Sequence, residues 1–513
     1  MPELPTVSPV PIGTLDTLIV VFYLVATTLL GIWLGRGQKN NRDYFLAGHK
    51  LPTWSLLLSI VATETSTVTF LSVPGKSFVA NGNFTFLQLA FGYIVGRFAI
   101  ILFLLPAYFR GEMLSAYHVL ESRFGLTTRR VASLVFLVTR NLADGLRLFL
   151  SAIALNIALE IPVVWCIVVM TVITAIYSVA GGVKSVVWND CIQFAVYMAG
   201  AFATVWIIIS NLPDGWNTLA AFGRDTHRWQ LFDFSAGILT KDVGFWNTIL
   251  GGPNKGVTFW NGLLGGAFLT LATHGVDQMI VQRYLCARDQ KSAGWALGMS
   301  GFVVLAQFAL FLLIGLALAA FYATVDQANA PNEGDKAFMT FVVGHMGAGF
   351  RGLILAAVLA ATMSNLSASF NSSASSLMSD WLGRWLSKTD ERSGLRMARI
   401  LTIASAIVHA AVAIAVYEIG LQKSVVDAVL GIAGFAVGLL LGLYALGLFS
   451  RRITEQTALI AFLVGTVVMC CVWLFSPVNS WWYTLIGSST VAIIGFALSA
   501  LRDPPAPAVA KLQ

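Results

Sequence analysis

Residues 55–75 read SLLLSIVATETSTVTFLSVPG, and this stretch decides the fold of the chain. It is apolar enough to cross a bilayer, yet its middle carries the polar run TETST at 63–67, followed by Thr69. Backbone in hydrocarbon must find partners within the protein, and an ionisable side chain such as Glu64 faces a protein interior or a wet cavity. We therefore predict a broken helix whose carbonyls and hydroxyls coordinate a small cation beside a solute. The alternative is a kinked helix whose hydroxyls bond their own backbone.

The composition indicates a membrane protein. Of the 513 residues, 57% are hydrophobic and 11% are charged, whereas soluble domains carry about 25% charged residues. Apolar runs long enough to span a bilayer recur throughout the sequence. The net charge of +7 is spread over short loops, so it does not indicate a nucleic-acid partner. The five cysteines have no metal-binding or redox spacing, and we expect no cofactor.

The apolar runs predict an all-α membrane protein with thirteen transmembrane helices. The predicted spans are 15–35, 51–73, 84–109, 130–157, 161–180, 187–210, 258–281, 293–322, 350–378, 396–418, 427–449, 456–475 and 482–501. Lysine and arginine gather in alternate loops, as at Arg36, Arg130 and Arg451. Because basic loops stay on the cytoplasmic side, we expect a multi-pass protein of the plasma (inner) membrane, with the N-terminus outside and the C-terminus in the cytoplasm.

The seventh predicted span, 258–281, is also interrupted by polar residues, at Thr270, Thr273, His274 and Asp277. Two interrupted spans at corresponding places in two halves are typical of a transporter site. The spacing predicts an inverted five-plus-five helix repeat with discontinuous first and sixth core helices. The expected parts are an N-terminal peripheral helix and loop (1–50), a first five-helix repeat (51–210), an extracellular cap loop (211–257), a second, inverted five-helix repeat (258–449), two C-terminal peripheral helices (450–501) and a disordered cytoplasmic tail (502–513).

Residues 360–373, AATMSNLSASFNSS, form a dense run of small and hydroxyl side chains in the ninth predicted span. Hydroxyl, amide and carbonyl oxygens suit a hard, weakly charged cation. Small residues also let membrane helices approach closely, so the alternative is a packing surface. We favour a cation site over a packing surface for this run.

The fourth predicted span carries Arg140, Asp144 and Arg147 within two helical turns. The trio leaves one excess positive charge, which could hold a substrate carboxylate. The alternative is a structural ion network in which Arg147 is neutralised by Glu64 or Asp190. A lone histidine such as His274 in a helix is typical of a hydrogen-bonding wall residue, although its titration range also permits a proton shuttle.

Several short motifs then follow one another along the spans. They are DYFLAG at 43–48, YSVAGG at 177–182, WND at 188–190, DQ at 277–278 and VQRY at 281–284. With 361–373 and 438–449, they make the chain resemble the sodium:solute symporter family, solute carrier 5 type, over roughly residues 40–450. Members include sodium/galactose, sodium/sialic acid and sodium/proline symporters. The resemblance implies the fold of the bacterial leucine transporter and sodium-driven alternating access around a mid-membrane site.

The resemblance also implies a sodium site between the first and eighth core helices. Its ligands would be the carbonyls of Ala62, Thr65 and Ala361 and the hydroxyl of Ser364. The next position usually carries a second hydroxyl, but here it is Asn365, whose amide oxygen can also coordinate sodium. This departure leaves open whether the coupling ion is sodium or a proton.

Some members have a second sodium site, built by hydroxyls one turn further on and by an acid at the position of Asp190. Ser367 fits that pattern but Ala368 does not, so we expect one sodium ion rather than two. Glu64 stands where proline symporters carry an aspartate, and that likeness implies that it tunes the ion site or relays a proton.

Substrate positions follow from the same resemblance. They are Ser66, Thr69, Phe84, Gln88, Thr270, Thr273 and His274, with Arg147 as the carboxylate anchor. Sugar-transporting members tend to carry an acid at the position of Gln88 and bulky aromatics near Thr273 and His274. The present set is more similar to that of sialic-acid and other carboxylate members.

We therefore predict a secondary active symporter that imports a small organic solute with sodium, favouring a carboxylate-bearing anion. A sodium/sugar or polyol symporter is the nearest alternative. An uncoupled or proton-coupled transporter or a channel is the alternative of another class, but a channel would carry a continuous polar stripe along several helices. We find no nucleophile–base or metal set for an enzyme. The expected partners are the solute, sodium and membrane lipid, with the monomer as the functional unit.

Overall fold

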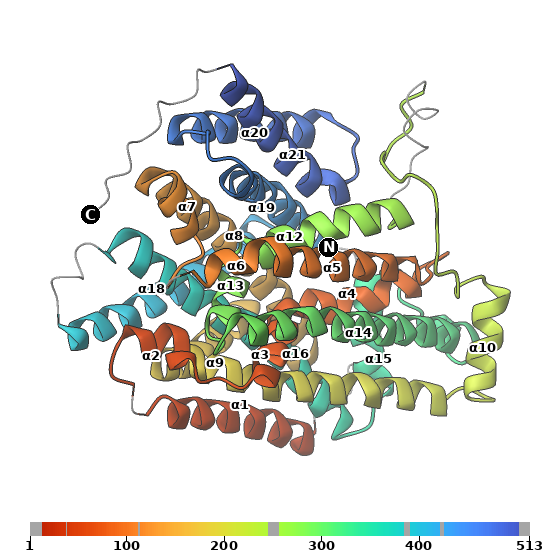
Figure 1. Cartoon of the computed structure of the whole chain (residues 1–513). Coiled ribbons are helices and arrows are strands. Elements are labelled where there is room, and N and C mark those ends of the chain that lie inside the picture. The colour runs from red at the N-terminus through yellow and green to blue at the C-terminus, as the bar shows by residue number, and fades with distance from the viewer. Residues whose placement is uncertain are drawn as a thin grey trace.

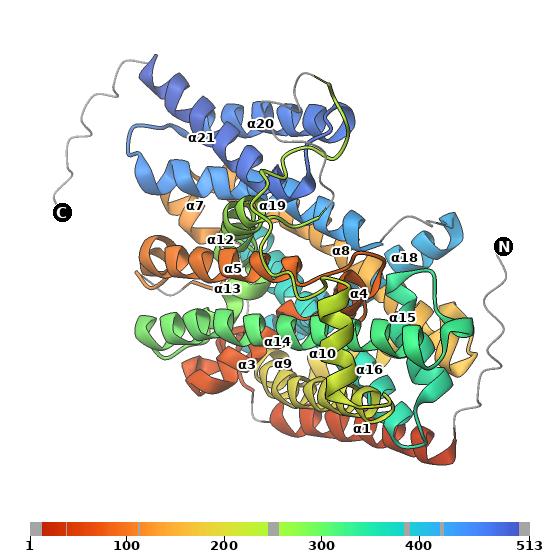
Figure 2. The ribbon, with the colours of Figure 1, turned by 90° about the vertical axis from the view of Figure 1, so that its right-hand side faces the viewer.

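The computed structural model describes residues 13–36, 38–110, 113–244, 256–383, 390–420 and 425–501. Every regular element in these ranges is a helix, and the extended pairing they contain is a single bridge between Leu239 and Val478. Long helices run side by side through the molecule, and shorter ones lie across their ends (Figures 1 and 2). The predicted tail 502–513 lies outside the described residues, as do residues 245–255 of the predicted cap.

The helices follow one another in this order: α1 (Thr14–Leu34), α2 (Asn41–Leu46), α3 (Thr53–Glu64), α4 (Thr67–Phe78), α5 (Gln88–Ala99), α6 (Leu105–Tyr108), α7 (His118–Arg123), α8 (Leu126–Leu159), α9 (Val163–Ser210), α10 (Trp216–Asp225), α12 (Gly266–Gly275), α13 (Gln278–Leu285), α14 (Gln290–Thr324), α15 (Gly334–His345), α16 (Phe350–Ser376), α18 (Glu391–Ile419), α19 (Val425–Phe449), α20 (Glu455–Phe475) and α21 (Tyr483–Ala500). Short turns of 3₁₀ or π geometry extend several of them, as at Ile100–Leu104, Asn261–Gly265 and Leu377–Trp381.

Eight helices in the described residues are long and apolar enough to cross a membrane, which makes this a multi-pass membrane protein. The count of thirteen is not confirmed. One reason is that α3 and α4 have 12 residues each, so each rises only about 18 Å against a hydrocarbon core of about 30 Å. Another is that the 48-residue α9 contains two of the predicted spans. These are divided at Gly182, where φ is +52° and ψ is −154°.

Both predicted helix interruptions are confirmed. Helix α3 ends at Glu64, Thr65 is extended (φ −80°, ψ 98°), and the Ser66 hydroxyl begins α4 by accepting a hydrogen bond from the Thr69 amide. Helix α12 ends at Gly275, and the Asp277 carboxylate begins α13 by accepting from the Met279 amide at 2.8 Å. Ser and Asp are preferred N-cap residues, so the polar residues that mark the breaks in the sequence also restart the helices.

Helix α16 lies at the centre of the bundle. Every side chain from Ile354 to Ser376 is buried, and the helix packs against α9, α8, α18 and α1. Its many alanines and serines permit this close approach. Helices α1 and α20 lie at the periphery, where exposed Phe22 and Val467 face outward as side chains in contact with lipid would.

The described part of the cap loop closes one end of the bundle (Figure 2). The Arg228 guanidinium donates to the carbonyls of Ser77, Phe78 and Val79 at 2.6, 3.1 and 2.8 Å, which completes the C-terminal turn of α4. The Phe84 amide donates to the Gln230 carbonyl at 3.0 Å. These bonds hold the loop against the C-terminal end of α4 and the segment that leads into α5.

Candidate functional site

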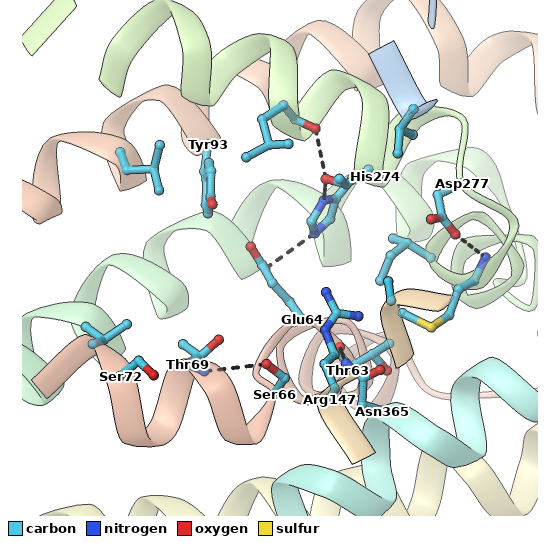
Figure 3. A pocket seen from close by; sticks show the side chains of 18 of the residues that line it. Thr63, Glu64, Ser66, Thr69, Ser72, Tyr93, Arg147, His274, Asp277 and Asn365 are labelled. Atoms are coloured by element: carbon cyan, nitrogen blue, oxygen red, sulfur yellow. Dashed lines mark hydrogen bonds and ion pairs between the residues drawn. The ribbon is translucent and has the colours of Figure 1, made fainter. Parts of the chain in front are cut away.

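A cavity of about 180 Å³ lies where the break between α3 and α4 faces α8, α12 and α16 (Figure 3). Its polar lining side chains include Thr63, Glu64, Ser66, Thr69, Ser72, Lys76, Thr139, Arg140, Arg147, Thr273, His274, Asp277 and Asn365. Both interrupted helices contribute to this lining. The polar residues that disrupt the apolar pattern of the sequence therefore meet in one place, where Glu64 of one break lies 3.3 Å from His274 of the other.

The break of α3 is held to α16 by Asn365. The Asn365 side-chain amide donates to the Thr63 carbonyl at 3.0 Å, and the Thr67 and Thr362 hydroxyls are 2.6 Å apart. Asn365 is 4% exposed, and its buried Oδ1 atom has no hydrogen-bond partner among the described residues. A buried oxygen of this kind costs free energy unless something occupies its lone pairs. It therefore points to a cation or a water beside Thr63.

The predicted sodium ligands Ala62, Thr65, Ala361 and Ser364 are all buried on the two helices joined by Asn365. Ala62 lies in the last turn of α3, where carbonyls lack intrahelical donors. The Thr65 hydroxyl donates to the Val61 carbonyl at 2.8 Å. The structure thus brings these positions to one helix–helix contact.

Asp190 on α9 lies next to this contact and is wholly buried. Its carboxylate accepts from Ser364 at 2.6 Å, Ser59 at 2.5 Å and Thr63 at 3.4 Å. Arg283 on α13 lies 3.7 Å away and is equally buried, so it balances the charge. A hydroxyl that donates its proton to Asp190 keeps lone pairs for a cation.

Ser367 is placed differently from Ser364. Its hydroxyl donates to the Ser364 carbonyl at 3.0 Å, within its own helix, whereas the Ser364 hydroxyl donates across to Asp190. The two serines therefore orient their hydroxyls toward different acceptors. The expectation of one sodium ion rather than two stays a prediction.

Glu64 faces α5 and α12 at the cavity wall. It forms an ion pair with Arg97, and its Oε2 atom lies 3.3 Å from Nε2 of His274 (Figure 3). The same His274 nitrogen lies 3.2 Å from the Arg97 guanidinium. A neutral Nε2 accepts from Arg97, whereas a protonated one donates to Glu64, so the proton on His274 decides which contact is a hydrogen bond.

The predicted excess of positive charge on α8 is neutralised by Asp277 of α13. Arg140 contacts Asp144 at 3.4 Å and also pairs with Asp277 at the start of α13, while Arg147 contacts Asp144 at 2.5 Å. Two arginines therefore face two aspartates. The alternative partners of Arg147, Glu64 and Asp190, pair with other residues, and the 19% exposed Arg147 side chain still reaches the cavity.

Lys76 is a lining residue that the sequence did not single out. It lies on α4, lines the cavity and is exposed. Among the described residues it has no carboxylate partner, unlike Arg140 and Arg147. The spacing of Ser66, Thr69 and Lys76 along one helix was the available signal, since residues three, four and seven apart share a face.

Three predicted substrate residues do not line this cavity. The Phe84 ring packs against Trp229 with centroids 5.3 Å apart. Gln88 is buried and holds the cap, donating to the Val257 carbonyl and accepting from the Asp233 amide at 3.2 Å. Thr270 is buried against Gly96.

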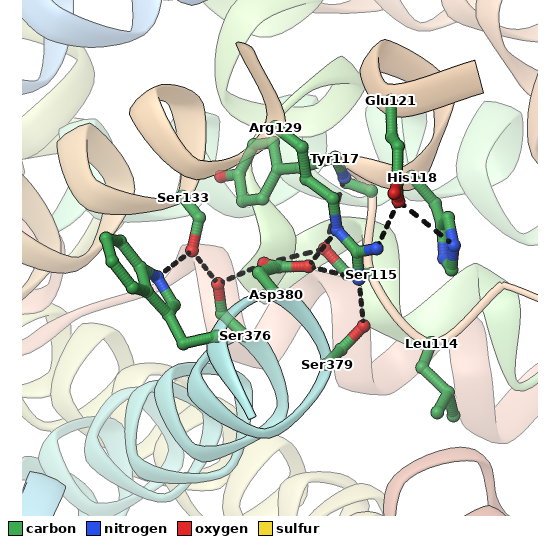
Figure 4. Close-up of polar contacts among 12 residues, drawn as sticks. Leu114, Ser115, Tyr117, His118, Glu121, Arg129, Ser133, Ser376, Ser379 and Asp380 are labelled. Carbon is green, nitrogen blue, oxygen red and sulfur yellow. Dashed lines mark hydrogen bonds and ion pairs between the residues drawn. The ribbon is translucent and has the colours of Figure 1, made fainter. Parts of the chain in front are cut away.

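A second polar cluster lies away from the cavity, between α7, α8 and the end of α16 (Figure 4). Arg129 pairs with Asp380 at 2.8 Å and with Glu121, and Asp380 also accepts from Ser376 at 2.7 Å and Ser115 at 3.0 Å. Buried pairs of this kind fix the position of helices because separating them leaves an unpaired charge.

The model of the sodium:solute symporter family matches residues 44–465. The chain belongs to the sodium:solute symporter family. Relatives of this family member include the sodium/sialic acid symporters of Proteus mirabilis, 28% identical over 96% of both chains, and of Aliivibrio fischeri, 26% identical over 94% of this chain and 92% of that protein. Human sodium-coupled monocarboxylate transporter 1 is 26% identical over 90% of this chain and 74% of its own length.

One solved structure agrees with this family membership, and a second shares the fold. A sodium-coupled sialic acid symporter, solved in a substrate-bound outward-open state, superposes with a TM-score of 0.84 at 26% identity, covering 96% of this symporter-family chain and 99% of that one. A nucleobase-cation-symport-1 family transporter superposes with a TM-score of 0.55 at 13% identity over 91% and 96% of the two chains, which shows the shared fold alone.

Proposed function

We propose that this chain is a sodium-coupled symporter that imports a small carboxylate-bearing solute by alternating access, and that it acts as a transporter rather than an enzyme. The relatives named above are symporters of sialic acid and transporters of monocarboxylates, which supports a solute of this class. The observation that carries the proposal is the Asn365 oxygen beside the interrupted α3, which has no partner in the described part of the chain and lies at a cavity that Lys76 also lines.

The coupling sodium ion would lie between the break of α3 and α16. The proposed ligands are the carbonyls of Ala62, Thr65 and Ala361, the Ser364 hydroxyl and the Asn365 amide oxygen. An all-oxygen set with few charges suits a hard monovalent cation. Asp190 would act through Ser364, since its carboxylate orients that hydroxyl at 2.6 Å.

The solute would occupy the cavity beside this ion. Ser66, Thr69, Thr273 and His274 line it and offer hydrogen bonds, and Arg147 offers N–H groups that Asp144 does not use. Phe84, Gln88 and Thr270 stay predictions that would need a different conformation of the chain.

We further propose thirteen spans, with residues 51–210 and 258–449 as inverted five-helix repeats and the flanking segments as peripheral parts. The two interrupted helix pairs, α3 with α4 and α12 with α13, support this arrangement. The distribution of lysine and arginine supports an outside N-terminus and a cytoplasmic C-terminus. A monomer holds the whole cavity and is the proposed functional unit.

Uptake into proteoliposomes tests the proposal. The purified chain is reconstituted, and uptake of labelled sialic acid, lactate and galactose is measured with an inward sodium gradient, a potassium gradient or a proton gradient alone. We expect sodium-dependent uptake of a carboxylate. We also expect Ser364→Ala to weaken the sodium dependence and Arg147→Gln to weaken carboxylate uptake, with Ser379→Ala, in the second polar cluster, as the matched control.

Three results would contradict parts of the proposal. Equal uptake with potassium would exclude sodium coupling, and uptake driven by protons alone would transfer the coupling role to Glu64 and His274. Preference for galactose over both acids would favour the sugar symporter.

A further inference from the structure

A second cavity, of about 610 Å³, lies on the outer surface of the bundle and shares no residue with the solute cavity. It is a groove formed by the end of α1, the first half of α9 and α18. Its walls are apolar and open to the surroundings of the protein. The exposed fractions of Val172, Ile176 and Ile407 are 51%, 45% and 63%.

Residues one helical turn apart on α9 and on α18 form the two long walls of the groove. Arg399, Ile403 and Ile407 stand one turn apart on α18, and Val172, Ile176 and Val179 do the same on α9. The end of α1 lies tightly on α9, because a Cβ atom at Gly35 would come within 2.2 Å of the Ala180 carbonyl oxygen. The Tyr44 hydroxyl lies 3.3 Å from the Ser178 carbonyl on α9 and 3.1 Å from the Thr402 hydroxyl on α18, so Arg36 and Arg399 lie at the same end of the groove.

The two arginines are uncompensated. Neither Arg36 nor Arg399 forms an ion pair with a carboxylate in the part of the chain that the structure describes, and the Nε atom of Arg399 is buried without a hydrogen-bond partner. The acids nearest to Arg399 along α18 are Asp390 and Glu391, at the start of the helix. They lie about 12 Å from Arg399 along the helix axis. A charged groove in a bilayer needs a counter-charge, and the described residues place no ion-pairing carboxylate on these two arginines.

We propose that this groove is a binding site for an acidic phospholipid, with the lipid phosphate on Arg36 and Arg399 and an acyl chain along Val172, Ile176, Ile403 and Ile407. Guanidinium groups bind phosphate oxygens in pairs. Basic pockets between transmembrane helices are suited to anionic headgroups, and the hydrocarbon chain of a lipid matches branched apolar walls. A small soluble anion has no hydrocarbon chain to contact those apolar walls.

The site also has a structural consequence. A lipid bound there would join α1, which lies outside the proposed repeats, to α9 and α18, which belong to different repeats. Because α9 and α18 belong to different proposed repeats, a bound lipid would stabilise one relative position of the two repeats.

Native mass spectrometry of the purified full chain tests this site. Phosphatidylglycerol or phosphatidylcholine with the same acyl chains is added to delipidated protein, and the bound fraction is measured. We expect at least about tenfold tighter binding of phosphatidylglycerol, and loss of that preference in Arg36→Gln/Arg399→Gln. The matched control is Arg392→Gln/Arg396→Gln, which removes the same charge from α18 outside the groove and should keep the preference.

A second variant, Ala175→Trp, fills the groove without changing its charge and should reduce binding of both lipids. Equal binding of the two lipids by the unaltered chain, equal loss in the control, displacement of the lipid by inorganic phosphate alone, or a dimer that covers the groove would each overturn the proposal. Thermal melting of each variant verifies its fold. If the arginine variant does not fold, unchanged lipid binding by Ala175→Trp overturns the proposal on its own.

Discussion

Replacing Asn365 by alanine tests the proposed ion site most directly. Asn365 donates to the Thr63 carbonyl at 3.0 Å, and its buried amide oxygen has no partner within the ranges that the structure describes. Truncation leaves the Thr63 carbonyl as an unsatisfied buried acceptor, which costs about 1–3 kcal/mol. When this cost destabilises the sodium-bound state relative to the sodium-free state, sodium binding weakens about 5- to 150-fold.

The assay is the sodium concentration that gives half-maximal solute uptake in proteoliposomes. We expect it to rise about tenfold or more in Asn365→Ala, corresponding to at least about 1.4 kcal/mol. Asn365→Ser should recover part of the loss, since a hydroxyl can also coordinate the ion. Half-saturation for the solute at saturating sodium should change less.

The matched control is Asn371→Ala, further along the same helix. Asn371 is equally buried and accepts from the Gln282 side chain at 2.8 Å. Its truncation should lower stability but leave the sodium dependence unchanged. Unchanged sodium dependence in Asn365→Ala, or an equal shift in Asn371→Ala, would refute the assignment of the ion site.

Three further predictions concern the solute, the second polar cluster and the bend of α9. Lys76→Gln should raise the half-saturation concentration of a carboxylate solute about tenfold, since a charged hydrogen bond contributes about 1.5–3 kcal/mol; no change in uptake assays would exclude Lys76 from the solute site. Asp380→Asn should destabilise the protein by about 3 kcal/mol, against about 1 kcal/mol for neighbouring Ser379→Ala, and equal melting temperatures of the two variants would contradict this. Gly182→Ala should lower the melting temperature more than Gly420→Ala. Both glycines have positive φ, but a Cβ atom at Gly182 would meet a carbonyl oxygen at 2.4 Å, whereas one at Gly420 would meet no described atom within 4 Å. Equal melting temperatures would show that backbone strain alone sets the loss of stability.

Local chemistry made several features predictable. The breaks at 63–67 and 273–277 could be located because polar residues interrupt apolar spans and include the N-cap residues Ser66 and Asp277. The buried run at 360–373 could also be located, since small side chains indicate close helix contact. The division of α9 at Gly182 falls in the gap between the predicted spans 161–180 and 187–210, but its positive φ could not be predicted, because a glycine in an apolar run does not by itself indicate that conformation.

The sequence by itself determined that the chain is a membrane protein of helices, and it located the two breaks and the oxygen-rich run that faces one of them. These are properties of short stretches of neighbouring residues, and the bilayer imposes them segment by segment. Only the tertiary structure decided which charged side chains are paired and which are left without a partner among the described residues. Asp277 neutralises Arg140 across 137 positions of sequence, Lys76 lines the cavity without a carboxylate partner among the described residues, and Arg36 meets Arg399 in a groove. Charge balance depends on which side chains lie within a few ångströms, and that distance is set by how the helices pack.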